Sequence, residues 1–231
     1  MKRKDPADAR VRQPQQARSR ATLDRLLGAA QQLLAEERFD AATVHEIVRR
    51  AGSSVGAFYS RFPDKDAFVQ CFDERCFANA QALWETFFSS AGWREATLEE
   101  ALAGLVRVMV EKSRLHKPAL RAIALYHRSR PDASFQERAA RVNEYMLAQV
   151  RERVLASGRF TNCANPAPVI DLGMVMVTSA VREIILFDKG YGAERLSDEE
   201  LIGELTRALL AYLGIAAKKP SRPIARKRKS P

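Results

Sequence analysis

The sequence lacks the features that mark several classes of protein. It has three cysteines, Cys71, Cys76 and Cys163, and an odd number at irregular spacing indicates neither a disulfide framework nor a zinc site. No run of about 18 uncharged apolar residues is present, so the sequence predicts no transmembrane helix. No apolar stretch follows the basic N-terminus, so we expect no secretory signal. These absences favour a protein of the reducing cytoplasm that holds no metal and no cofactor.

The sequence also lacks the signatures of catalysis. It has no glycine-rich phosphate loop, no His, Cys and Asp cluster at metal-ligand spacing, and no clustered pair of carboxylates. Cys163, in an expected loop, and the three histidines leave a thiol nucleophile with a histidine base as a formal alternative. No local signature supports that alternative, so we expect that the protein is not an enzyme.

Signals of β-structure are missing as well, because neither sustained alternation of apolar and polar residues nor an Asn-Gly or Asp-Gly turn occurs. Apolar residues instead recur at three- and four-residue steps behind residues that cap helices. The chain of 231 residues is 46% apolar, which is enough to bury a core of its own. The pattern predicts an all-α protein of about nine helices, over residues 19–36, 43–51, 55–61, 64–88, 97–114, 118–128, 131–156, 169–187 and 197–214.

The positive charge is concentrated in the two tails. The net charge of the chain is +10; residues 1–20 carry +5, residues 216–231 carry +7, and the segment between them carries −2. Basic arms of this kind suit a polyanion such as nucleic acid, although a solubilising tail has the same composition. Both tails are poor in apolar residues and contain prolines, so we expect them to be flexible when free.

Two short helices joined by a tight glycine turn are predicted within residues 43–62, and these are the proportions of a helix-turn-helix. Thr43 and Glu46 have capping-box spacing at the start of the first helix. Gly52 can supply the left-handed backbone that the turn needs, and Ser54 can cap the second helix.

In a helix-turn-helix the second helix enters the major groove of DNA. The short side chains of Val55, Gly56, Ala57 and Ser60 would let this helix lie flat there. Hydroxyls and cations that could reach phosphates are supplied by Thr43, Ser54, Tyr59, Arg61 and Lys65. Spacing alone leaves an ordinary helical hairpin as an equal alternative.

The residues themselves resemble a known family. The chain reads ARSRATLDRLLGAA from Ala17, FDAATVHEIV from Phe39 and AGSSVGAFYSRFPDK from Ala51. In order, spacing and residue type, the stretch from Ser19 to Phe72 closely resembles the TetR family of transcriptional regulators. The resemblance implies an all-helical homodimer, in which an N-terminal three-helix domain binds an operator. It further implies a larger C-terminal domain that binds a small ligand and dimerises.

Carried over by position, the resemblance assigns roles within the motif. It puts His45 at a base- or backbone-facing site and assigns the base-facing surface of the second helix to Val55, Gly56, Ala57 and Tyr59. Phosphate-contacting positions fall on Thr43, Ser54, Arg61 and Lys65, and core positions fall on Phe58 and Phe62. Two residues depart from the family pattern: Ser53 replaces an apolar residue, and Arg38 replaces a glycine.

The C-terminal half is less informative. Side chains that could line a ligand pocket are Trp84, Phe87, Phe88, Met109, Tyr126, His127 and Met174. Such side chains at helical spacing more often form a core, and that alternative stays open. Segments 169–187 and 197–213 lie where the family has its dimerising helices, and candidate interface residues there are Arg182, Leu205, Leu209 and Tyr212.

The sequence thus predicts a ligand-responsive repressor that leaves a palindromic operator when a small molecule binds. We expect a basic arm at 1–18, a helix-turn-helix domain at 19–66, a ligand-binding and dimerisation domain at 67–215, and a basic tail at 216–231. Double-stranded DNA, a small-molecule effector and a second copy of the chain are the expected partners. The alternative is a helical protein that binds DNA non-specifically through its tails.

Overall fold

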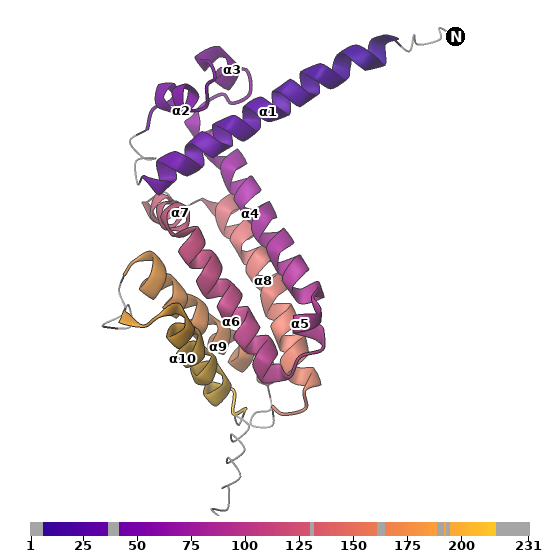
Figure 1. Ribbon diagram of the computed structural model, residues 1–231, viewed down its shortest axis with the longest axis vertical. Coiled ribbons are helices and arrows are strands. Elements are labelled where there is room, and N and C mark those ends of the chain that lie inside the picture. Colours follow the sequence, from indigo (N-terminus) through magenta and orange to yellow (C-terminus); the bar gives the residue numbers. More distant parts are fainter. Residues whose placement is uncertain are drawn as a thin grey trace, which may run out of the picture.

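Helices account for nearly all of the chain that the structure describes (Figure 1). The structure is a computed structural model that describes residues 7–36, 42–129, 132–160, 165–188, 192 and 195–215. No strand occurs in these ranges, which confirms the all-α prediction. The helices are α1 (Ala7–Ala35), α2 (Val44–Arg50), α3 (Val55–Tyr59), α4 (Lys65–Ser89), α5 (Ala91–Arg94), α6 (Leu98–Leu115), α7 (Lys117–Ser129), α8 (Ala133–Ala156), α9 (Pro166–Val181), the π-helical turn η1 (Arg182–Leu186) and α10 (Asp198–Tyr212).

Two of these helices begin at complete capping boxes. The hydroxyls of Thr97 and Ser197 accept hydrogen bonds from the backbone amides of Glu100 and Glu200. Each glutamate side chain in turn accepts a hydrogen bond from the backbone amide of its capping residue. Such reciprocal bonds satisfy amides that have no partner inside the helix. The starts of α6 and α10 were predicted from this spacing, and the structure confirms both.

The larger of two cores surrounds α6, which lies along the long axis of the molecule (Figure 1). α6 packs against α9 and α10, while α8 packs against α4 on the other side. The fully buried members of this core include Leu102, Leu105, Ile170, Met174 and Ile185. Burying aliphatic side chains of this size contributes about 1.5–3 kcal/mol each, which makes this core the main support of the body.

A second core lies beneath the first three helices. Leu26, Ala30 and Leu33 of α1 are fully buried against Ile47 of α2 and Phe58 of α3. α7 completes this core from the other side: its residues Ala119, Ala122, Ile123 and Tyr126 pack against it. Thus α7, which follows α6 in the chain, contacts the helix-turn-helix region directly.

Two helix starts and one additional short helix differ from the predictions. α1 begins at Ala7 and not at Ser19, because the Ala, Arg and Gln residues of this stretch favour helix. α9 begins at Pro166 and not at Val169, since proline fits the first turn of a helix. The short helix α5, capped by Ser90, falls where a loop was expected. Residues 1–6 of the predicted arm, the tail 216–231, Arg38, Phe39 and Cys163 lie outside the described residues.

The helix predicted over 169–187 does not stay regular to its end. Residues Arg182–Leu186 form η1, and Asp188, two residues after it, has a left-handed backbone with φ of 52°. The Asp188 carboxylate accepts a hydrogen bond from the Lys117 ammonium, with 2.7 Å between oxygen and nitrogen. This bond connects the irregular end of the helix to the start of α7. None of the described helices is long and apolar enough to span a membrane.

Candidate DNA-binding surface and ligand cavity

The turn between α2 and α3 has the geometry that the sequence predicts. Gly52 has φ of +55°; its amide donates to the carbonyl of Arg49, and the amide of Ser53 donates to the carbonyl of Val48. This pair of bonds ends α2 in a Schellman motif, which needs a left-handed residue at that point. Ser54 then caps α3, with its hydroxyl 3.1 Å from the amide of Ala57. The helix-turn-helix is therefore held by local backbone bonds.

α3 exposes one face and buries the other. Phe58 is fully buried and packs on Phe62 and Phe68, with ring centroids 5.3 and 5.4 Å apart. On the outer side Tyr59 is 52% exposed, and Gly56 is exposed. Figure 1 shows α2 and α3 together at one end of the molecule, next to α1. A half-exposed aromatic ring gives a binding partner a flat surface to contact, and the neighbouring glycine lets that partner come close to the backbone.

The other predicted DNA contacts fall into two groups. Thr43 and His45 are exposed at the start of α2, as is Ser54 at the start of α3. The side chains of Val55, Ala57, Arg61 and Lys65 are half-buried. Their roles toward DNA stay predictions, and they share the end of the molecule formed by α2, α3 and the start of α4.

Arg61 has a structural contact that the sequence did not reveal. Its guanidinium donates to the Ser19 hydroxyl of α1 at 2.8 Å, and its Nε is buried without a partner among the described residues. Arg25 of α1 likewise donates to the carbonyl of Ala51, the last residue of the α2 cap, at 3.1 Å. These two arginines fix α2 and α3 against α1 across 42 and 26 residues of sequence, a separation that local patterns do not encode.

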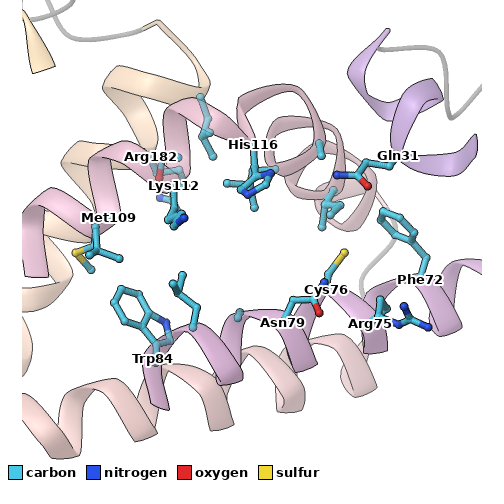
Figure 2. A pocket seen from close by; sticks show the side chains of 18 of the residues that line it. Gln31, Phe72, Arg75, Cys76, Asn79, Trp84, Met109, Lys112, His116 and Arg182 are labelled. Atoms are coloured by element: carbon cyan, nitrogen blue, oxygen red, sulfur yellow. The ribbon is translucent and has the colours of Figure 1, made fainter. Parts of the chain in front are cut away.

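A cavity of about 890 Å³ opens between the helix-turn-helix region and the body (Figure 2). Its apolar lining comes from Leu27 of α1, Phe72 and Trp84 of α4, Met109 of α6 and Val181 of α9. Its size is that of a site for a small organic molecule. Gly28 also lines it, and a Cβ built there meets nothing within 4 Å, so α1 faces open space at this position.

Only part of the predicted pocket set lines this cavity. Trp84 and Met109 do, whereas Phe87, Phe88, Tyr126, His127 and Met174 are not among its lining residues. Phe87 and Phe88 instead pack with Trp93 into the larger core, at 5.5 and 4.9 Å between centroids. The sequence missed the polar residues that project into the cavity: Gln31, Arg75, Asn79, Lys112, His116 and Asn143.

His127 is a buried partner of Asp73. Its Nε2 lies 2.9 Å from the Asp73 carboxylate, and its ring stacks on Phe135 of α8 at 3.6 Å. Burial raises the pKa of Asp73, although the imidazole and Arg138 act against this shift. The pair joins α4 to α7 and does not line the cavity. Nearby, burial raises the pKa of the Cys76 thiol to about 12, so this cavity residue is a neutral thiol at neutral pH.

The predicted interface residues differ in their accessibility. Leu209 is 2% exposed and belongs to the chain's own core, and Leu205 is half-buried against that core. Tyr212 is 37% exposed, and the exposed Arg182 lines the cavity. The outer side of α9 carries an apolar stripe that the sequence analysis did not single out, formed by Leu172, Val175 and Met176 at 48–52% exposure.

The comparisons with known proteins agree with this geometry. Residues 26–70 match the family model "Bacterial regulatory proteins, tetR family". Similar solved structures include a TetR transcription regulator from Haloarcula marismortui, with a TM-score of 0.63 and 16% identity over 84% of this chain and 96% of the other. Another is a putative TetR-family regulator from Mesorhizobium loti, with a TM-score of 0.62 and 18% identity over 86% and 98%.

A third similar structure is a putative TetR-family regulator from Rhodococcus sp., with a TM-score of 0.61 and 14% identity over 83% of this chain and 98% of the other. No curated protein matches the chain in sequence. At such low identities the solved structures show a shared fold, whereas the match at residues 26–70 is one of sequence. Residues 26–70 therefore match the tetR family of bacterial regulatory proteins in sequence, and the chain as a whole shares the fold of solved TetR-family regulators.

Proposed function

We propose that the protein is a homodimeric repressor that leaves its operator when a small molecule fills the cavity. The observation that carries the proposal is the cavity's position. Leu27, Gly28 and Gln31 of α1 line it together with residues of α4, α6 and α7. An occupant would therefore touch the helix that supports α2 and α3. A ligand can shift the balance between two arrangements only if it binds them with different affinity, and a cavity lined by both α1 and the helices of the body would permit this.

The expected DNA contacts are those of the end formed by α2 and α3. His45, Val55, Gly56, Ala57 and Tyr59 are proposed to face base edges. Backbone phosphates would be contacted by Thr43, Ser54, Arg61 and Lys65. In a dimer, two such surfaces about 34–36 Å apart would meet successive major grooves of a palindromic site in the cytoplasm. Because Val55, Gly56 and Ala57 offer no hydrogen-bonding side chains, discrimination between bases would depend mostly on His45 and Tyr59.

Footprinting on DNA from around the protein's own gene tests this function. Lys65→Ala should weaken binding to all sequences alike and reduce the salt dependence by about one counterion, because it removes one phosphate contact. Tyr59→Ala should relax the preference for the footprinted site. Arg94→Ala is the matched control, since this exposed arginine lies on α5, at the far end of α4 (Figure 1).

Two outcomes would contradict the assignment. Full affinity in both folded variants would separate α3 from DNA binding. If binding depends on salt but shows no preferred site, the protein would instead be one that binds DNA non-specifically.

A further inference from the structure

The charged side chains around the cavity are mostly of one sign. Arg75, Lys112 and Arg182 line it, and Asp24 is the only acid among the described lining residues. Asp24 already pairs with Arg75, with 3.2 Å between the carboxylate and the guanidinium. Among the residues that the structure describes, Arg182 pairs with its neighbour Glu183, at 3.3 Å and outside the lining. Lys112 and Arg182 thus give the cavity a positive potential that its own residues do not balance.

These two cations lie on the same wall. Lys112 is on α6, and Arg182 begins η1, which packs against α6. In Figure 2 both side chains lie on the α6 side of the cavity, and the imidazole of His116 points into the space from the same side. Like charges held close together repel unless an anion lies between them, and such a site favours a carboxylate or a similar oxyanion.

The rest of the cavity is apolar. Met109, Met146 and Val181 form a buried part of the lining, and Trp84 presents its ring from the opposite wall, on α4 (Figure 2). A ligand that satisfies both parts must carry a negative head and an apolar body. A cationic ligand would meet Lys112 and Arg182, and the one acid among the described lining residues, Asp24, is already paired with Arg75. A neutral apolar ligand would leave the positive charge inside the cavity without a counter-charge there.

We propose that the cavity binds an amphipathic organic anion, with its anionic head held by Lys112, Arg182 and His116 and its apolar body against Trp84 and Met109. This inference rests on the proposed function only in treating the cavity as the effector site. The chemistry of the head, an oxyanion with delocalised charge, is common to free carboxylic acids and to sulfonates.

A pair of fluorescent probes tests this charge preference. 8-Anilinonaphthalene-1-sulfonate carries an anionic group on an aromatic body, and N-phenyl-1-naphthylamine has the same body without the charge. The purified protein should bind the anionic probe about tenfold more tightly. Lys112→Gln/Arg182→Gln should remove most of that advantage and leave the affinity for the neutral probe unchanged. Equal affinity of the wild type for both probes would overturn the proposal.

Two further variants locate the probes. Arg94→Gln/Arg207→Gln removes the same total charge from exposed positions on α5 and α10, outside the cavity lining, and should change neither affinity. Gly28→Phe places a ring in the open space that α1 faces, and should weaken both probes together. If Gly28→Phe leaves both affinities intact, the probes lie elsewhere and the cavity assignment is wrong.

Displacement on the wild-type protein keeps the test independent of how the variants fold. Decanoate should displace the anionic probe, whereas decanol should do so at least about tenfold less well and decyltrimethylammonium least of all. A reversed order would overturn the inference. Release of DNA is measured separately with decanoate: if it binds in the cavity but leaves the DNA complex intact, the ligand chemistry stands and the ligand-released repressor fails.

Discussion

At the scale of single residues, the buried carboxylate of Asp73 has the clearest dependence on pH. It is 2% exposed and contacts His127, and burial raises its pKa above the ordinary 3.8. Removing either partner would leave a buried polar group unsatisfied, which costs about 1–3 kcal/mol. The pair therefore holds α4 to α7 at a defined distance.

The raised pKa of Asp73 fixes the sign of a pH effect. The unfolded chain loses this proton near pH 3.8, whereas the folded chain keeps it to a higher pH, so folding takes up a proton between these limits. The free energy of unfolding of the wild type, measured relative to Asp73→Asn by urea denaturation, should be greatest near pH 4. It should then fall as the pH rises through the raised pKa. Asn is a suitable reference because it keeps the shape and one hydrogen bond to His127. A relative stability that grows from pH 4 to 7 would contradict this assignment.

At the scale of helices, the sequence predicted the caps and turns that depend on neighbouring residues. It missed the contacts that depend on how distant helices pack. Thr97, Ser197 and Gly52 act through bonds to residues within four or five positions, so their roles could be inferred from spacing. The two arginines that join α1 to the motif act across long stretches of sequence. Phe87 and Phe88 satisfy the pattern of either a core or a pocket, and only the position of α5 with Trp93 decides that they are core.

The contact of α9 with α10 shows the same dependence on packing. A Cβ built at Gly173 would lie 3.0 Å from Leu209 and 3.1 Å from Tyr212, closer than side chains normally approach. At Gly203 of α10, in contrast, a Cβ would meet nothing within 4 Å. The sequence presents both as glycines inside a predicted helix, and gives no sign that one of them permits a close helix contact.

Substituting alanine for Gly203 and for Gly173 should therefore change the free energy of unfolding in opposite directions. Gly203→Ala should raise the free energy of unfolding by about 0.5–1 kcal/mol, because alanine loses less backbone entropy in a helix. Gly173→Ala gains the same propensity, but the side chains of Leu209 and Tyr212 would have to shift to make room for the added Cβ. We expect this overpacking to cost roughly 1–3 kcal/mol, so the variant should be destabilised overall. Thermal unfolding of the two variants beside the wild type measures the difference. If Gly173→Ala is as stable as Gly203→Ala, α9 and α10 do not pack as closely as described.

At the scale of the whole molecule, the proposed function requires three surfaces to work together. α2 and α3 lie at one end of the molecule (Figure 1). The cavity is lined in part by α1, and the apolar stripe is on α9. A single helix-turn-helix surface contacts one half-site, so a palindromic operator requires two chains held at a fixed spacing. The stripe formed by Leu172, Val175 and Met176 is an exposed apolar face suited to that contact, and Tyr212 of α10 packs beside it near Gly173.

The last prediction separates dimerisation from folding. Leu172→Asp should turn a dimer into monomers, because it would bury an unpaired charge between two copies of α9. The half-exposed side chain can remain in water in the monomer, so its fold should be retained. Light scattering gives the mass, and operator affinity should fall with it, since each monomer holds only one half-site. Leu155→Asp, at 45% exposure on α8, is the matched control and should stay dimeric.

Leu209→Asp would not serve, because Leu209 lies in the chain's own core and its loss would unfold the monomer. A wild type that is monomeric at micromolar concentration, or a Leu172→Asp variant that stays dimeric, would show that α9 is not the contact that sets the spacing of the two DNA-binding surfaces.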